Sequence, residues 1–219
     1  PALLSENDVA RAAHPTQVNF ENQIELRGYE FDSRSVKPGD NLRITLYWQA
    51  LAPMNESYRV FVHVIGPADR SAGGADVIPG RGAFPTVYWK PGDLFRDMVS
   101  VPISADATPG KYSIEVGLYP VGRVGNRLSV VESGDSRALI DAIKVAPSQP
   151  AVFNPQNRLA ATFDNKIDLM GYDTSSAPVT LRLVIYWRAR TKIDQDYKVF
   201  VHALDVDGTI IDQVDRQPQ

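Results

Sequence analysis

Two histidines and the aromatic residues beside them are the part of this sequence best suited to contact a ligand. The pattern Tyr-x-Val-Phe-Val-His ends at His63 and again at His202. Alternate side chains of a strand share one face, so each histidine lies on the same face as the phenylalanine two positions earlier, Phe61 or Phe200. This pairing suits a saccharide, because the C–H faces of a sugar stack on rings and its hydroxyls need hydrogen-bond partners.

Further candidates depend on which strands are neighbours. If the strand that carries Tyr47 lies beside the strand that carries His63, the two side chains share an outer surface. The same arrangement in the second pattern places Tyr186 beside His202. Trp89, in a loop-like stretch rich in proline, is either an exposed stacking residue or, the interpretation we favour, a plug at the open end of a sandwich. The candidate ligand-binding residues are Tyr47, Phe61, His63, Trp89, Tyr186, Phe200 and His202. The alternative for the histidines is structural, with each ring packed between strands and bonded to a backbone group.

The sequence lacks the common motifs for catalysis, metals and cofactors. It contains no Gly-x-Ser-x-Gly elbow, no phosphate-cradling loop and no His-Glu-x-x-His pair. A Ser-His-Asp triad would have to use His14, His63 or His202, and the last two occupy equivalent positions of a repeat. Without cysteine there is no disulfide, no thiol nucleophile and no cysteine-based metal site. We therefore expect no catalytic residue, no cofactor and no metal.

Acidic residues offer two further patterns. Residues 205–208 (DVDG) resemble the start of a calcium loop, but the twelfth position is Arg216, where a bidentate glutamate is required, so a hairpin turn is predicted. Four acidic residues recur at matching places along the chain and are predicted to face solvent from strands; they are Glu25, Glu30, Asp168 and Asp173.

Composition argues against two classes of partner. The 219 residues carry 23 Lys plus Arg against 26 Asp plus Glu, a net charge of −3, whereas a nucleic-acid module usually carries a basic excess. No apolar run approaches the ~18–20 residues that a membrane span needs. We expect no nucleic-acid partner and no membrane span within this chain.

An internal repeat organises the sequence. The matching segments are residues 20–29 with 163–172, residues 42–50 with 181–189, and residues 58–63 with 197–202. The offset is 143 in the first pair and 139 in the other two, so four residues are lost between them, in a predicted loop. Over residues 42–63 the two copies share ten identities without a gap.

The repeat defines the expected domains: a lead-in segment over residues 1–17, a complete repeat over residues 18–146, a linker over residues 147–158, and a partial repeat over residues 159–219. The second copy has no counterpart of residues 81–145, which suggests a fragment of a longer polypeptide that ends inside its second domain. Half a sandwich exposes strand edges. We expect residues 159–219 to pair with the first domain, to pair with another chain as a dimer, or to be completed by further sequence.

Each copy is predicted to be all-β. Apolar residues recur at every second position over residues 42–49, the period of a strand with one buried face. Further strands are predicted over residues 58–65, 98–103, 111–119 and 139–145, separated by turns that use many of the 16 prolines and 15 glycines. The only room for a helix lies near residues 4–13. This pattern predicts an immunoglobulin-like antiparallel β-sandwich.

Four segments carry a resemblance to a known family; they are residues 47–50 (YWQA), 60–63 (VFVH), 84–93 (FPTVYWKPGD) and 109–119 (PGKYSIEVGLY). They resemble the β-sandwich region C-terminal to the membrane-embedded part of bacterial glycosyltransferase-like proteins of the dolichyl-phosphate-mannose protein mannosyltransferase type, particularly from Chloroflexus-like bacteria. The resemblance covers nearly all of the first copy and the second copy as far as it extends. Residues 66–74 (GPADRSAGG) depart from it, because this stretch replaces the simple Asp-x-x-Gly hairpin that the second copy keeps as residues 205–208 (DVDG).

The resemblance implies a domain outside the cytoplasmic membrane that belongs to or accompanies a sugar-transferring enzyme, and it supplies no catalytic residue. The leading hypothesis is a non-catalytic extracytoplasmic module that binds or presents a saccharide or another cell-envelope partner. Its other partner would be the remainder of its own longer polypeptide. The first alternative is a structural spacer or a protein–protein interaction array. The second is a sugar hydrolase, which would need two carboxylates about 5–9.5 Å apart in one cleft.

Overall fold

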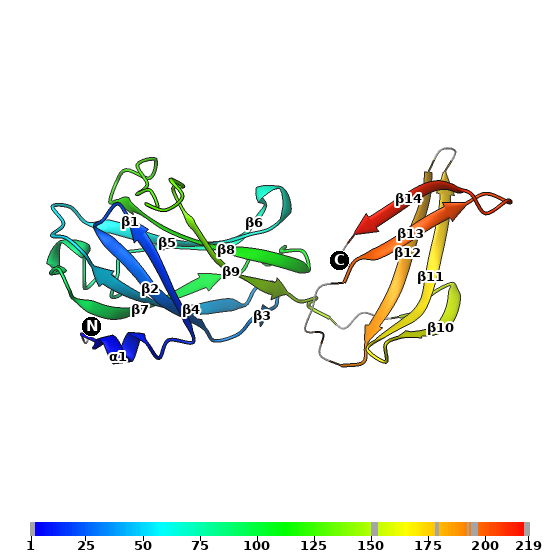
Figure 1. Cartoon of the computed structure of the whole chain (residues 1–219), viewed down its shortest axis with the longest axis horizontal. Coiled ribbons are helices and arrows are strands. Elements are labelled where there is room, and N and C mark those ends of the chain that lie inside the picture. The colour runs from blue at the N-terminus through cyan, green and yellow to red at the C-terminus, as the bar shows by residue number, and fades with distance from the viewer. Residues whose placement is uncertain (1–2, 150–152, 178–179, 192, 194–196, 217–219) are drawn as a thin grey trace. The chain divides into compact units, whose positions relative to one another are not determined.

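The computed structural model describes residues 3–149, 153–177, 180–191, 193 and 197–216 (Figure 1). The chain divides into two compact units, residues 1–148 and residues 149–219. The division falls inside the predicted linker, residues 147–158.

The first unit consists of one short helix and nine strands among its described residues. They are α1 (Glu6–Val9), β1 (His14–Phe20), β2 (Ile24–Phe31), β3 (Ser35–Val36), β4 (Asn41–Ala50), β5 (Tyr58–Ile65), β6 (Ser71–Val77), β7 (Leu94–Pro102), β8 (Gly110–Pro120) and β9 (Ala138–Val145). Two single 3₁₀ turns lie at Pro67–Asp69 and Thr86–Tyr88.

The strands of the first unit form two sheets. Sheet A has the order β1-β2-β4-β7 and sheet B the order β3-β9-β8-β5-β6. All pairs are antiparallel except β3 with β9, which is parallel. The order β2-β4-β7 opposite β9-β8-β5-β6 corresponds to strands A-B-E opposite G-F-C-C′ of immunoglobulin domains. The all-β sandwich predicted from the sequence is therefore the observed fold. In the described part of the chain, no helix is long and apolar enough to cross a membrane.

The core lies between the two sheets and follows the predicted period of two. On β4 the inward side chains Leu42, Ile44, Leu46 and Trp48 are fully buried. The inward residues of β5 and β8 join them in one buried cluster. Because alternate residues of a strand point to opposite faces, the intervening positions are left to form the outer surfaces.

The second unit contains five strands among its described residues: β10 (Asn157–Phe163), β11 (Ile167–Ala177), β12 (Thr180–Ala189), β13 (Val199–Leu204) and β14 (Ile210–Arg216). They form a three-stranded sheet, β10-β11-β12, and a hairpin, β13-β14. The three-stranded sheet repeats β1-β2-β4 pair by pair, with the register shifts at equivalent places. Trp48 contacts Phe20 at 6.2 Å between ring centroids, and Trp187 contacts the equivalent Phe163 at 5.8 Å. The sequence repeat is thus a structural repeat.

Two details differ from the sequence predictions. The lead-in segment is part of the first unit, because it contains α1 and the start of β1. Strand β10 begins at Asn157, inside the predicted linker. Residues 66–74, which depart from the family pattern, keep the internal repeat, because β5-β6 and β13-β14 have the same loop length and the same register. The turn predicted at residues 205–208 is present, with the Asp205 carboxylate accepting hydrogen bonds from the Asp207 and Thr209 amides.

Candidate functional site

The predicted neighbourhood of Tyr47 and His63 is wrong, because their strands belong to different sheets. Tyr47 lies on β4 in sheet A, and His63 lies on β5 in sheet B. The two side chains therefore face opposite outer surfaces of the sandwich. Tyr186 and His202 are separated in the same way, since β12 and β13 belong to different sheets. The hydrophobic period of each strand was correct, but it does not specify which strands pair.

Tyr47 fastens the lead-in segment to sheet A. Its side chain is only 6% exposed beneath Val9 and Leu94, and its hydroxyl donates to Glu30 Oε1 at 3.0 Å. The Ala13 amide donates to the same oxygen at 3.4 Å. Burial first, and then the hydrogen bond to Glu30, raise the pKa of the Tyr47 hydroxyl. The carboxylate thus joins a strand to the segment that precedes β1.

The second unit contains the same pair of hydrogen bonds to a carboxylate. The Tyr186 hydroxyl donates to Asp173 Oδ2 at 2.6 Å, and the Gln156 amide donates to Asp173 Oδ1 at 2.6 Å. These residues are the repeat equivalents of Tyr47, Ala13 and Glu30. The hydroxyls of both candidate tyrosines are therefore engaged within the protein, and Glu30 and Asp173 are structural acceptors.

The other repeated carboxylates are also engaged within their sheet. Asp168 is buried, contrary to the prediction that it faces solvent, and it accepts from Thr162 and from Arg188 at 2.6 Å. Hydrogen bonds from Arg188 and Thr162 lower the pKa of this carboxyl. Glu25, its equivalent, is paired with Arg27 at 3.4 Å.

Asp76 organises the outer face of sheet B around His63. One oxygen, Oδ1, is 2.9 Å from His63 Nε2, and the other, Oδ2, accepts from the Tyr119 hydroxyl at 2.9 Å. The Arg59 guanidinium donates to the Asp76 carbonyl at 2.9 Å. Three strands, β5, β6 and β8, therefore converge on one residue. Burial, and then the bond to Asp76, raise the pKa of the Tyr119 hydroxyl.

Phe61 lies buried beneath the polar side chains of this face and is not an exposed stacking surface. It is fully buried, with the Arg127 guanidinium carbon 4.4 Å above the ring centroid and the His63 ring at 4.9 Å. Opposite Phe61 on β8 is Gly117, where an added Cβ would lie 2.3 Å from the Phe61 ring. Only glycine leaves room for the ring to lie flat across β8. We call the group formed by Arg59, His63, Asp76, Tyr119 and Arg127 the Asp76 cluster.

Within the Asp76 cluster, His63 and Asp76 are accessible, whereas Tyr119 is buried. The side chains of His63 and Asp76 are 26% and 37% exposed. Glu115 lies across from His63 on β8 and is paired with Arg137 at 3.1 Å. The face thus presents fixed donors and acceptors, held by strands on both sides of β5.

Trp89 is buried in the core of the first unit and is not an exposed stacking residue. Its ring is 2% exposed and lies 4.1 Å from Phe95 between ring centroids. The indole donates to the Phe84 carbonyl at 3.1 Å. In the second unit, Phe200 and His202 repeat the pair formed by Phe61 and His63, with ring centroids 5.2 Å apart.

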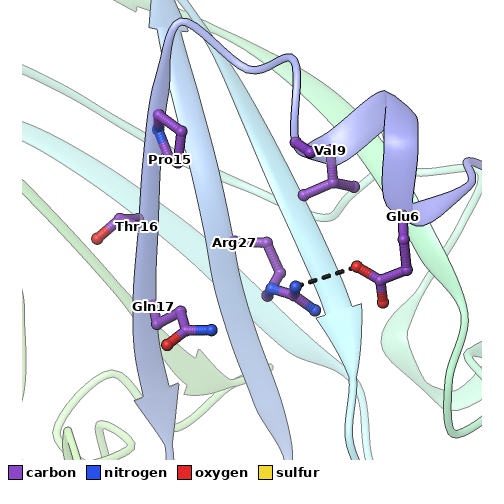
Figure 2. Close-up of a pocket in the computed structure, with 7 residues that line it drawn as sticks. Glu6, Val9, Pro15, Thr16, Gln17 and Arg27 are labelled. Carbon is purple, nitrogen blue, oxygen red and sulfur yellow. Dashed lines mark hydrogen bonds and ion pairs between the residues drawn. The ribbon is translucent and has the colours of Figure 1, made fainter.

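Two cavities of the first unit lie elsewhere. One, of about 440 Å³, lies between α1, β1 and β2, where Glu6 is hydrogen-bonded to Arg27 at 3.1 Å (Figure 2). The other, of about 310 Å³, includes Arg81 and Asp97. Each is lined by a single carboxylate, so neither offers the carboxylate pair that a sugar hydrolase requires. Within the described residues, no group of three or more His, Asp or Glu side chains is placed to hold a metal.

The Asp76 cluster presents hydrogen-bond donors and acceptors from neighbouring strands. The bond from His63 to Asp76 would orient an imidazole as a base, but the described hydrogen bonds bring no serine or threonine hydroxyl to that ring. Sequence reasoning found Phe61 and His63 but missed Asp76, Tyr119 and Arg127. The sequence does contain one indication of Asp76, because the equivalent residue of the second copy, Asp215, is also an aspartate.

The known proteins compared with this chain resemble it distantly. No protein-family model and no curated protein sequence matches it. Among solved structures, the chain is similar to the C-terminal domain of wzt, with 11% identity and a TM-score of 0.46 over 70% of this chain and 92% of that chain. It is also similar to Spo0M, a sporulation control protein from Bacillus subtilis, with 9% identity and a TM-score of 0.30 over 89% of each chain. At these values neither likeness assigns a function to the chain.

Proposed function

We propose that the first unit is a non-catalytic module that binds a saccharide through the Asp76 cluster. One observation supports this proposal above the others: both oxygens of the Asp76 carboxylate are hydrogen-bonded, yet the side chain is more than a third exposed. The guanidinium of Arg127 lies nearby, over the Phe61 ring. Neighbouring hydroxyls of a sugar pair well with carboxylate and guanidinium groups, because both present several hydrogen-bonding atoms in a fixed plane.

The charges of this face favour a saccharide that carries carboxylates. With Arg137, the face holds three arginines against the two carboxylates Asp76 and Glu115. Each carboxylate already has a partner within the protein. Arg127 lies over a ring, and no hydrogen bond or ion pair is recorded between it and another described residue, so its donors can reach a ligand.

The test is calorimetric titration of the whole chain with an oligogalacturonate and with a neutral malto-oligosaccharide. We expect saturable binding of the acidic oligosaccharide, weakened about 10–100-fold by Arg127→Ala, because a hydrogen bond to a charged group contributes about 1.5–3 kcal/mol. Arg123→Ala is the matched control, since Arg123 belongs to the same loop but is paired with Glu56. Binding that Arg127→Ala leaves unchanged would overturn the assignment of the site.

Absence of binding to any saccharide would instead favour the structural spacer. In that case the contacts of Asp76 serve to fasten β6 and β8 to β5. His63→Ala would then lower the free energy of unfolding without any loss of a binding activity.

We also propose that the module lies outside the cytoplasmic membrane and accompanies a membrane glycosyltransferase of the mannosyltransferase type. The resemblance of residues 84–93 and 109–119 to that family supports this placement. Protease treatment of intact protoplasts tests it. Digestion of the module from outside is the expected result, and protection until the cells are lysed would contradict it.

A further inference from the structure

The second unit contains a copy of the β5-β6 hairpin, β13-β14, with the same pairing at every position. Phe200 lies opposite Asp215 as Phe61 lies opposite Asp76, and the register shifts before the last pair in both hairpins. The ring centroids of Phe200 and His202 are 5.2 Å apart, against 4.9 Å in the first unit.

In the first unit, the other edge of β5 is covered by β8. Arg59, Phe61 and His63 lie opposite Tyr119, Gly117 and Glu115. In the described part of the second unit, β13 pairs with β14 alone. As a result Phe200 is 70% exposed where Phe61 is fully buried.

Two features of β8 match groups that the second unit also possesses, and a third feature is its apolar inward face. Gly117 makes room for the Phe61 ring, and Phe200 is the equivalent ring. The Tyr119 hydroxyl reaches across β5 to Asp76, and Asp215 is the equivalent carboxylate. The inward residues of β8 are apolar and fully buried in the core, and they are Ile114, Val116 and Leu118.

We propose that the free edge of β13 binds an extended segment in antiparallel orientation, with the pattern apolar-x-apolar-Gly-apolar-Tyr. Strand addition to an exposed edge gains main-chain hydrogen bonds, and the alternating side chains provide selectivity. The glycine would lie opposite Phe200, and the tyrosine would donate to Asp215. This surface is independent of the saccharide site proposed on the first unit.

A second copy of this chain does not fit the edge. Neither β13 nor β14 contains a glycine, so a two-fold pairing of these hairpins would set a Cβ against Phe200. The β8 strand of a second copy is held between β5 and β9 in a five-stranded sheet and would have to leave its own core. The occupant is therefore not a second copy of this chain but another segment with the stated pattern.

The probe is a labelled synthetic peptide with the sequence of residues 109–121, titrated into the whole chain by fluorescence anisotropy. We expect saturable binding at one peptide per chain and slower hydrogen exchange of the amides of β13. A Gly117→Val peptide should bind at least about tenfold more weakly, because its side chain would meet Phe200. Equal binding of the two peptides, no saturable binding, or protection confined to β5 would overturn the proposal.

The contact with Asp215 is tested by a double-mutant cycle. Asp215→Ala should weaken the binding of the original peptide but not that of a Tyr119→Phe peptide. Asp212→Ala, an exposed aspartate on the same strand, is the matched control and should weaken neither. If sedimentation shows a dimer that excess peptide does not dissociate, a second copy covers the edge and the proposal fails.

Discussion

At the scale of single residues, the repeat distinguishes side chains that hold the fold from those that face a ligand. Tyr47 and Tyr186 make the same bonds in both units, each to a carboxylate that also accepts a backbone amide. Sequence alone could not separate this role from ligand binding. The partners, Ala13 and Gln156, precede their strands in segments where the two copies have no matching pattern.

Tyr47→Phe should therefore destabilise the first unit. The variant keeps the buried ring but leaves Glu30 with one donor fewer, which we expect to lower the free energy of unfolding by about 1–2 kcal/mol. Urea unfolding followed by tryptophan fluorescence measures the change. Tyr88→Phe, at an exposed position, is the control and should unfold like the unmodified chain. Equal midpoints for Tyr47→Phe and the control would contradict the structural role.

Asp97 gives a prediction about pH. It is 5% exposed, Oδ1 accepts from the Gly80 amide at 3.0 Å, and Oδ2 accepts no hydrogen bond from any described residue. Burial raises the pKa of this carboxyl above its usual 3.8. Between the unfolded and folded pKa values the native state holds a proton that the unfolded state has lost, so stability falls as pH rises through that window and then levels off.

Asp97→Asn removes this charge while keeping an acceptor for Gly80. We expect the variant to be more stable than the unmodified chain at pH 7, by about 1 kcal/mol, and the difference to shrink as pH falls toward 4. Urea unfolding from pH 4 to pH 8 measures both curves, with the exposed Asp135→Asn as control. A difference that stays constant across this range would show that the charge of Asp97 is not its cause.

At the scale of elements, the sequence predicted strands well and their neighbours poorly. Period-two patterns located β4 and β5 within a few residues, and the prolines and glycines at its ends delimited β8. The two-residue β3 is too short to produce a pattern, and β6 is rich in glycine, which has no side chain to reveal a face. Strand pairing depends on contacts between distant segments, so the separation of β4 from β5 could not be obtained from either strand alone.

Helix α1 shows how an element of four residues contributes to the sandwich. Its Ser5 and Asp8 form a capping box, and Val9 packs with Ala12 and Leu94 over the Tyr47 ring. An isolated helix of this length would not be stable in water, so the packing of Val9 is what keeps it formed.

Val9→Ala should thus destabilise the first unit by about 1–3 kcal/mol, since it removes buried methyl groups from a small cluster. Thermal unfolding followed by circular dichroism measures the loss. Arg11→Ala, at an exposed position just after the helix, is the control. If Val9→Ala matched the control, the packing of the lead-in segment would not contribute to the stability of the first unit.

At the scale of the whole molecule, the two units share a pattern but differ in how far their cores are closed. Among the described residues, every buried hydrophobic side chain other than proline lies between Val9 and Val145, in the first unit. In the second unit, Leu181 and Phe200 are exposed, although their equivalents Leu42 and Phe61 are fully buried. Hydrophobic burial is the main favourable term in folding, so the second unit has much less to hold it together.

The chain should consequently unfold in urea in two steps, the first belonging to the second unit. Residues 1–148 alone should keep the later step at an unchanged midpoint, because that unit contains its own core. Trp187 belongs to the first step and Trp48 to the second, so Trp187→Phe should remove the fluorescence change of the early step only.

If strand addition at β13 occurs, the peptide of residues 109–121 should raise the early midpoint and leave the later one in place. A single step for the whole chain, at a midpoint that residues 1–148 alone do not reproduce, would mean that the two units stabilise each other.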